Sequence, residues 1–89
     1  MKQTGTTFGF QDAIRILKEG RTVTRQGWSR AGDVVIFIKA QYPNENSKMT
    51  KPYLYMVKKY EQEGAEECDM FPIDLSAESI FAEDWIEMV

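Results

Sequence analysis

The sequence predicts a single α+β domain over residues 1–89, with an N-terminal helix packed on a four- to five-stranded antiparallel sheet and a short helical turn before the last strand. Three observations support this fold class. Apolar residues follow helical spacing near the N-terminus, and several later runs alternate or are continuously apolar, as strands are. A chain of 89 residues with 43% apolar residues is enough for one hydrophobic core but short for two domains.

The helix is expected to begin at Phe10 and to be the clearest element of the fold. Gly9 can act as its N-cap, an acid in the first turn suits the helix dipole, and Gly20 is a suitable C-terminal stop. Four apolar side chains lie three or four positions apart and therefore share one face: Phe10, Ala13, Ile14 and Leu17. We expect this face to belong to the core.

Two strands are expected to follow the helix. Residues 21–25 alternate in the manner of a half-buried strand, and a turn that contains Trp28 comes after them. Residues 34–38 are apolar on both faces, although one helix can cover only one face of a small sheet. The second face is therefore expected either to form a subunit interface or to be covered by the chain's own loops.

The middle of the chain is expected to contain one further strand, with a polar segment before it and a charged segment after it. Residues 41–52 form a long polar loop, which is typical either of a binding loop or of a mobile connection. Residues 53–57 are expected to form a strand with Tyr53 and Tyr55 on one face. Residues 58–67 are highly charged, and we interpret them as an exposed hairpin turn.

The C-terminal part is expected to contain two short strands around the helical turn. Residues 70–73 are placed at a sheet edge, because Pro72 has no N–H to donate to a ladder. Ser76 can cap the helical turn, and residues 85–89 alternate like a final strand.

The residue types that are missing exclude most enzyme classes. The chain has no histidine, which removes Ser-His-Asp triads, histidine bases and His-containing zinc sites. Cys68 is the only cysteine, so neither an internal disulfide nor a thiolate cluster can form. There is also no Gly-rich phosphate loop. Carboxylates, Lys, Tyr and Arg remain available for catalysis, so an enzyme would have to be an unusual one, and we expect no bound metal and no cofactor.

Hydropathy predicts a protein that is not attached to a membrane. No run approaches the roughly 20 apolar residues that a membrane span needs, and the N-terminus does not lead into an apolar signal region. We expect the protein to be made and kept in a cytoplasm.

Charge is distributed unevenly along the chain. Residues 1–60 carry all 11 Lys and Arg with four acids, a net charge of +7, whereas residues 61–89 carry ten acids and no base, a net charge of −10. Either the two parts pair within one fold and largely cancel, or they form separate basic and acidic surfaces. The pI of about 4.9 argues against a duplex nucleic-acid binder and leaves room for a local Arg and Lys pocket that binds a small anion.

The residues around Trp28 have the chemistry of a nucleotide site. A flat indole can stack on a base while Arg25 and Arg30 contact phosphate, and Ser29 adds a hydroxyl beside them. The alternative is that Trp28 closes the edge of the core and the arginines lie in solvent.

Four further residues are candidates. Asp74 and Ser76 lie at the entrance to the short helix, where a helix N-terminus favours anions and a carboxylate can hold ribose hydroxyls, although Ser76 also suits a plain N-cap. Tyr55 lies on an aromatic strand face that is core, interface or pocket wall. Asp84 can cap or pair beside Trp85.

The order of these signals resembles the Thoeris anti-defence 2 family of phage proteins. Residues 10–13 (FQDA) and 17–28 (LKEGRTVTRQGW) are similar to the family pattern F-x-x-A-x-x-x-L-K-x-G-x-x-V-x-R-x-G-W. Residues 82–85 (AEDW), followed by an apolar strand, resemble its other hallmark, and residues 52–53 resemble the opening of its middle strand. The resemblance spans nearly the whole chain.

The resemblance implies a non-catalytic sponge in the host bacterial cytoplasm. Family members bind and hold glycocyclic ADP-ribose, a cyclic ADP-ribose isomer that bacterial Thoeris systems make as an alarm signal, so the downstream effector stays inactive. They form tetramers with signal pockets at subunit interfaces, and some members also bind cyclic oligonucleotides at separate sites. By this resemblance Trp28 stacks on the base, Arg25 contacts phosphate or orients the ligand, and Asp84 is a motif residue with a structural role. The residues expected to bind the ligand are Arg25, Trp28, Ser29, Arg30, Tyr55, Asp74, Ser76 and Asp84.

Two other function classes fit the same sequence. An acidic phage module that docks on a host enzyme predicts salt-sensitive binding and a monomer with an exposed apolar patch. A small carboxylate-based nucleotide hydrolase predicts turnover of the ligand that depends on Asp74 or Asp84.

Overall fold

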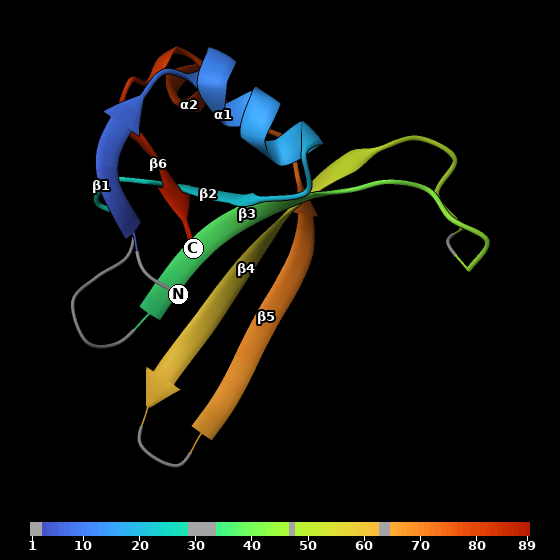
Figure 1. Cartoon of the computed structure of the whole chain (residues 1–89). Helices are drawn as coiled ribbons and strands as arrows, with labels where there is room; N and C mark the ends of the chain where they lie inside the picture. The colour runs from blue at the N-terminus through green and yellow to red at the C-terminus, as the bar shows by residue number, and fades with distance from the viewer. Residues whose placement is uncertain (1–2, 29–33, 47, 63–64) are drawn as a thin grey trace.

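The computed structural model describes residues 3–28, 34–46, 48–62 and 65–89, which form a six-stranded sheet and two helices (Figure 1). The elements in chain order are β1 (Gln3–Phe8), α1 (Phe10–Lys18), β2 (Thr22–Arg25), β3 (Val34–Gln41), β4 (Tyr53–Gln62), β5 (Ala65–Ile73), α2 (Ala77–Phe81) and β6 (Trp85–Met88). All neighbouring strands are antiparallel, in the spatial order β1-β6-β2-β3-β4-β5. The α+β class is therefore confirmed, whereas the expected number of four to five strands is wrong.

The strand that the sequence did not predict is β1. All of its residues except Phe8 are exposed, so it lacks the apolar alternation that marks a half-buried strand. It exists because it pairs with β6 at the other end of the chain, with Phe8 opposite Trp85. The pairing register shifts between Gln3 and Thr7, and Gly5 has a φ of +87°, which further obscures a period of two.

Helix α1 begins and ends where the sequence predicts. Gly9 is its N-cap, and after the last helical residue the chain turns through Gly20, whose φ of +83° lies in the region that favours glycine. The helix packs on β2, β3 and β6. The buried core that results contains Ala13, Ile16, Leu17, Val23, Ile38 and Trp85.

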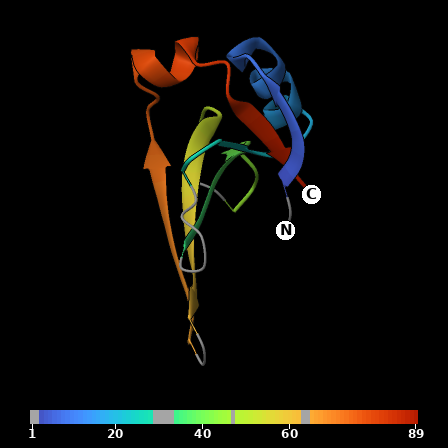
Figure 2. The same cartoon turned by 90° about the vertical axis from the view of Figure 1, so that its left-hand side faces the viewer.

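Strands β4 and β5 form a long hairpin that extends away from the two helices (Figures 1 and 2). The expected hairpin turn over residues 58–67 is therefore wrong for most of its length, because Lys58 pairs with Asp69 and the ladder continues to Gln62 opposite Ala65. A backbone ladder needs no apolar side chains, so charged residues can extend it into solvent. The connection at residues 63–64 lies outside the described residues.

The position of β5 at the sheet edge is confirmed. It pairs only with β4 in the sheet order, and Pro72 lies in it opposite Tyr55. The strand is longer than the predicted residues 70–73, since it begins at Ala65.

Strand β3 contributes to an apolar cluster on each face of the sheet. Ile38 is part of the core under α1, whereas its neighbour Phe37 belongs to a second buried cluster with Val57 and Met88. Half-buried Val35 and Tyr55 pack against this second cluster, which contains no helix residue. Both helices lie over the same end of the sheet (Figure 1). The prediction that the second face is a subunit interface stays a prediction.

Ion pairs connect the basic first part of the chain to its acidic end. Arg21 Nη1 lies 2.9 Å from Glu87 Oε2, and Arg25 Nε lies 2.8 Å from Asp84 Oδ1. At these positions the two oppositely charged parts pair within one fold, as one of the two interpretations expected. Neither helix in the described ranges has the length and apolar character that crossing a membrane requires.

Candidate ligand-binding site

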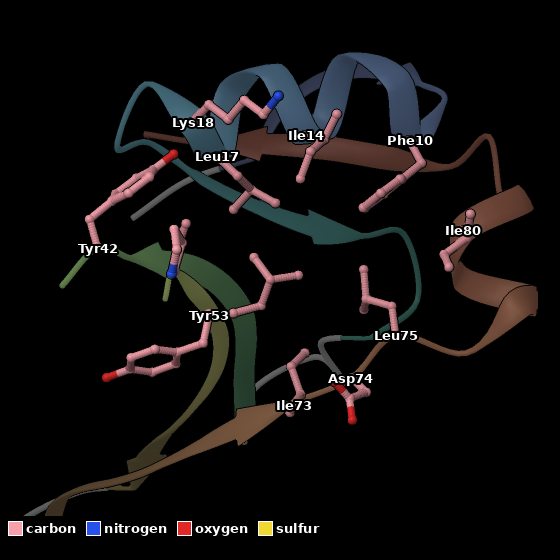
Figure 3. A pocket seen from close by; sticks show the side chains of 13 residues that line it. Phe10, Ile14, Leu17, Lys18, Tyr42, Tyr53, Ile73, Asp74, Leu75 and Ile80 are labelled. Carbon is pink, nitrogen blue, oxygen red and sulfur yellow. The ribbon is translucent and has the colours of Figure 1, made fainter. Parts of the chain in front are cut away.

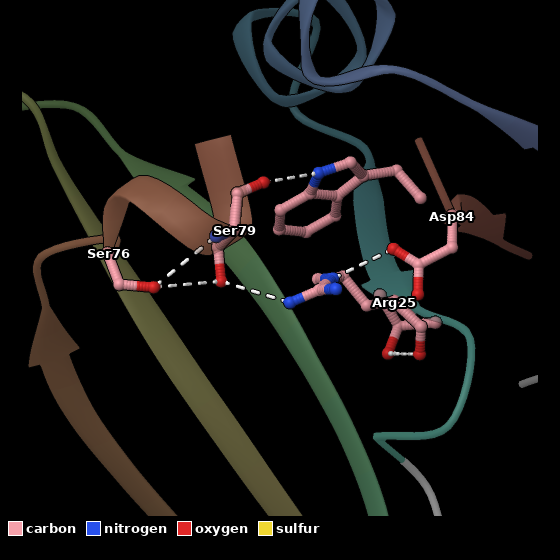
Figure 4. A network of polar contacts seen from close by, with 6 residues as sticks. Arg25, Ser76, Ser79 and Asp84 are labelled. Carbon is pink, nitrogen blue, oxygen red and sulfur yellow. Dashed lines mark hydrogen bonds and ion pairs between the residues drawn. The ribbon is translucent and has the colours of Figure 1, made fainter. Parts of the chain in front are cut away.

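Arg25, the last residue of β2, lies at the centre of a polar network (Figure 4). Its Nε donates to Asp84 Oδ1 at 2.8 Å, and its Nη1 donates to Ser79 Oγ at 3.3 Å. The Arg25 side chain is 16% exposed and that of Asp84 is 33% exposed, so solvent screens the ion pair only in part. The backbone N–H of Gln26 also donates to the Asp84 carbonyl at 2.9 Å, which holds the end of β2 beside the start of β6.

The same network fixes the short helix α2. Ser76 is its N-cap, as predicted, and the Ser76 hydroxyl accepts from the Ser79 N–H at 3.3 Å. The two serine hydroxyls are also 3.4 Å apart and hydrogen-bonded. The Ser79 carbonyl accepts from Nε1 of Trp85 at 2.9 Å, and Trp85 is fully buried. Ser79 therefore connects α2 to the core through both its side chain and its backbone.

Trp28 packs against this network as part of an aromatic group. Its ring lies edge-to-face on Trp85, with centroids 5.3 Å apart and an interplanar angle of 75°. Phe10 packs on the same Trp85 ring at 5.4 Å, and the Arg25 guanidinium lies 5.9 Å from the Trp28 centroid. Because Trp28 is only half-buried, it closes the edge of the core and still exposes part of its side chain.

The structure brings together half of the residues predicted to bind a ligand. The four that meet in this network are Arg25, Trp28, Ser76 and Asp84. Tyr55 lies elsewhere, on the opposite face of the sheet beside the cluster of Phe37 and Val57. Asp74 borders a separate cavity. Ser29 and Arg30 lie outside the described residues.

This cavity, with a volume of about 640 Å³, lies between α1, the ends of β3, β4 and β5, and α2 (Figure 3). Phe10, Ile14 and Leu17 point from α1 toward Ile73 and Leu75 on the other side of the cavity (Figure 3). The lining residues are Phe10, Ile14, Leu17, Lys18, Ala40, Tyr42, Pro52, Tyr53, Leu54, Ile73, Asp74, Leu75 and Ile80. The interior is therefore apolar and contains aromatic rings.

Polar groups are confined to a few positions around the cavity. Among its described lining residues Lys18 supplies the one cation and Asp74 the one carboxylate. Tyr42 and Tyr53 add two phenol groups, and Tyr42 is 45% exposed. An apolar interior with a small number of polar groups is typical of a small-molecule site, because the walls supply buried area and the polar groups fix the orientation.

Sequence reasoning missed this cavity because it assigned the apolar face of α1 to the core. Leu17 is fully buried, as expected, but Phe10 and Ile14 are only half-buried and border the cavity. The available signal was the pair of tyrosines at the ends of the polar loop, Tyr42 and Tyr53. The sequence could not show that the two ends of this loop, at Tyr42 and Pro52, border the same cavity as α1.

A smaller hollow of about 390 Å³ lies on the opposite face of the sheet. Tyr55, Phe37 and Val57 contribute to its walls, and Lys39 and Lys59 supply two positive charges. The candidate contact Tyr55 therefore belongs to a surface different from that of Asp74. No group of three or more acidic or cysteine side chains within the described ranges is placed to hold a metal ion.

A small α+β domain with an apolar cavity and sparse polar groups at its edge has the features of a small-molecule-binding protein. Residues 8–88 match the Tad2-like family model, whose description is Thoeris anti-defense 2-like domain. Since the match covers nearly the whole chain, the protein belongs to this family, as the resemblance of its two ends predicted. Membership indicates a phage counter-defence role against Thoeris. No curated protein matches the chain.

Proposed function

We propose that the protein is a non-catalytic sponge that binds and holds a cyclic ADP-ribose isomer made by Thoeris defence, glycocyclic ADP-ribose, in the host bacterial cytoplasm. The observation that carries this proposal is the cavity of about 640 Å³ on a chain of the Thoeris anti-defense 2-like family. Its volume falls within the range of roughly 300–1,000 Å³ that is usual for small-molecule sites.

The lining chemistry suits the parts of such a ligand. An adenine base can pack among Phe10, Ile14 and Leu75, which lie together in the cavity (Figure 3), since flat rings and aliphatic side chains bury its faces. In this proposal Lys18 would pair with the pyrophosphate and Asp74 would accept hydrogen bonds from ribose hydroxyls, since both residues line the cavity. This assignment retains Asp74 from the residues that the sequence predicted.

The network around Arg25 lies on the other side of α2 and is a second part of the proposed site. Arg25, Trp28, Ser76 and Asp84 stay candidate ligand contacts, together with Ser29 and Arg30. In the structure Nε and Nη1 of Arg25 already have partners inside the chain, so a phosphate contact by those atoms requires exchange of partners. The exposed part of Trp28 is the surface on which a base can stack.

We also propose that the protein is a homo-oligomer, with a tetramer as the expected assembly. The cluster of Phe37, Val57 and Met88 contains no helix residue, and Met70 on the neighbouring edge strand is 67% exposed. A second copy would cover this face, and Tyr55 with it. A ligand contact made by Tyr55 would then lie between two copies, where enclosure slows release.

The proposal is tested by release of the ligand in intact form. The purified protein is mixed with a filtrate of Thoeris-activated cells, freed of small molecules by gel filtration, and heated to release what it bound. We expect mass spectrometry to find an intact ADP-ribose isomer that still activates the Thoeris effector. Cyclic oligonucleotides, the second ligand class that the resemblance implies, are examined in the same eluate.

The other outcomes separate the competing functions. A linear product in place of the cyclic isomer would show hydrolysis and contradict a sponge. A filtrate that keeps its full activity, with no nucleotide released from the protein, would contradict binding and favour a module that docks on a host enzyme. Bovine serum albumin at the same concentration controls for nonspecific retention.

A further inference from the structure

We infer that Ser79 is a positioning residue that fixes α2 as one wall of the cavity and thereby sets how long the ligand stays bound. This inference rests on the proposed function, because it concerns the same cavity. The residue lies outside that cavity and is 8% exposed. It would act on the ligand through the helix that carries it.

The first part of the argument is that α2 cannot hold its own position. It has five residues, Ala77–Phe81, whereas isolated helices shorter than about 12 residues are marginal in water. The Ile80 N–H donates to the carbonyl of the N-cap Ser76 at 3.0 Å and the Ala82 N–H donates to the Ser79 carbonyl at 3.4 Å, so α2 is little more than one helical turn. Its placement must therefore come from packing against α1 and from hydrogen bonds to the rest of the chain.

Those bonds converge on one residue. Ser79 Oγ accepts from Arg25 Nη1 at 3.3 Å, and the Ser79 carbonyl accepts from Trp85 Nε1 at 2.9 Å. Arg25 is itself held by Asp84, and Trp85 is fully buried, so both partners are fixed in the sheet. Ser79 also bonds with Ser76 through both its N–H and its hydroxyl. No other residue of α2 has a side-chain hydrogen bond of this kind among the interactions that the structure describes.

The second part of the argument is that α2 contributes directly to the cavity. Ile80, the residue after Ser79, lines the cavity and lies at its end opposite Tyr42 (Figure 3). It is 44% exposed in the structure, so its contacts do not bury it on their own. A ligand in the cavity would cover Ile80, and release of the ligand at this end would require α2 to move.

The prediction for the free protein follows from the loss of one hydroxyl. We expect Ser79→Ala to raise amide hydrogen exchange in residues 77–81 about tenfold, since a hydrogen bond to a charged donor is lost. Ser79→Thr, which keeps a hydroxyl, should restore most of the protection. Glu78→Gln, at an exposed position of the same helix, should leave exchange as in the wild type.

The prediction for the ligand uses the cyclic ADP-ribose isomer recovered by heat release from the wild-type protein. We expect Ser79→Ala to speed its dissociation about tenfold, Ser79→Thr to bring the rate back toward the wild type, and Glu78→Gln to change nothing. Dissociation is followed by competition with unlabelled isomer after isotopic labelling. Melting temperatures of the three variants are measured at one protein concentration.

Each outcome has one meaning. Unchanged exchange in Ser79→Ala would overturn the inference, and so would faster exchange with unchanged dissociation, because α2 would then not retain the ligand. An equal loss of retention in Glu78→Gln would overturn it as well. Failure of the wild type to retain any nucleotide would instead overturn the proposed function together with this role, and that result is seen before any variant is measured.

Discussion

Arg25 and Asp84 lie 59 positions apart in the chain and form an ion pair in which Nε and Oδ1 are 2.8 Å apart. The pair joins the end of β2 to the residue before β6, and the backbone bond from Gln26 to Asp84 reinforces the same junction. Arg25 belongs to the first of the two sequence motifs on which the family resemblance depends, and Asp84 belongs to the second. In the structure these motifs therefore meet at one point.

The ion pair should contribute to stability as well as to the site. We expect Arg25→Ala and Asp84→Ala each to lower the free energy of unfolding by about 2 kcal/mol, with a coupling of about 1 kcal/mol in the double mutant. The expected coupling energy is lower than that of a fully buried ion pair, because the Asp84 side chain is 33% exposed and partly screened by solvent. Urea unfolding at a fixed protein concentration measures all three values.

The exposed pair Asp12–Arg15 provides a matched control for this cycle. Its atoms are 3.5 Å apart and its side chains are 54% and 65% exposed, so we expect each alanine variant to cost at most a few tenths of a kcal/mol. If the Arg25–Asp84 cycle shows no more coupling than this surface pair, the junction is held by the backbone bond and core packing alone.

Filling the cavity should abolish retention of the signal. Ile14→Trp places a large ring in the space between α1 and Leu75, so we expect nucleotide recovered by heat release to fall at least tenfold, as loss of a ligand-sized volume implies. Gln11→Trp adds the same ring at an exposed position of α1 and should bind as the wild type does. Circular dichroism verifies that both variants fold. If Ile14→Trp retained as much nucleotide as the wild type, the ligand could not bind in this cavity.

The positive charge of Lys18, the one cation among the described lining residues of the cavity, should contribute to ligand affinity. Lys18→Gln is expected to weaken binding of the isomer about tenfold, the usual effect of losing one charge-assisted hydrogen bond. The salt dependence of binding should also become less steep. Isothermal titration calorimetry at two salt concentrations tests both effects, with Lys18→Arg as the charge-conserving variant and Lys48→Gln as an exposed control. An equal loss in Lys48→Gln would indicate only a change in overall charge.

A charged residue on the face opposite the helices should dissociate the proposed oligomer. Met70→Lys places an ammonium beside the cluster of Phe37 and Val57, where contact with a second copy would bury it at high cost. We expect light scattering after gel filtration to show smaller species than for the wild type. Met49→Lys, at a residue that is 47% exposed in the loop after β3, should not change the assembly. A monomeric wild type would refute the interface itself.

Local elements of the fold were predictable because their signals are contained in a few neighbouring residues. The apolar spacing in α1, its Gly9 cap and the Ser76 cap of α2 depend on contacts within one or two turns. The edge position of β5 followed from Pro72, which lacks a backbone donor. The family resemblance likewise rested on two short motifs, and the match over residues 8–88 bears it out.

Elements that depend on distant partners were not predictable in the same way. Strand β1 has no apolar pattern and exists through pairing with β6, and the charged ends of β4 and β5 look like a turn until their ladder is seen. The cavity is a further case, since Phe10 and Ile14 have the spacing of core residues whether or not something covers them.

The sequence by itself determined the fold class, the helix caps and the family resemblance, and it predicted candidate nucleotide contacts that stay a prediction. Only the tertiary structure decided that Arg25 is engaged by Asp84 and Ser79, that Trp28 packs on Trp85, and that an apolar cavity lies on the other side of α2. The physical reason is that residue type and spacing specify what a side chain can bind. Which partner it meets depends on segments that come together only when the sheet closes.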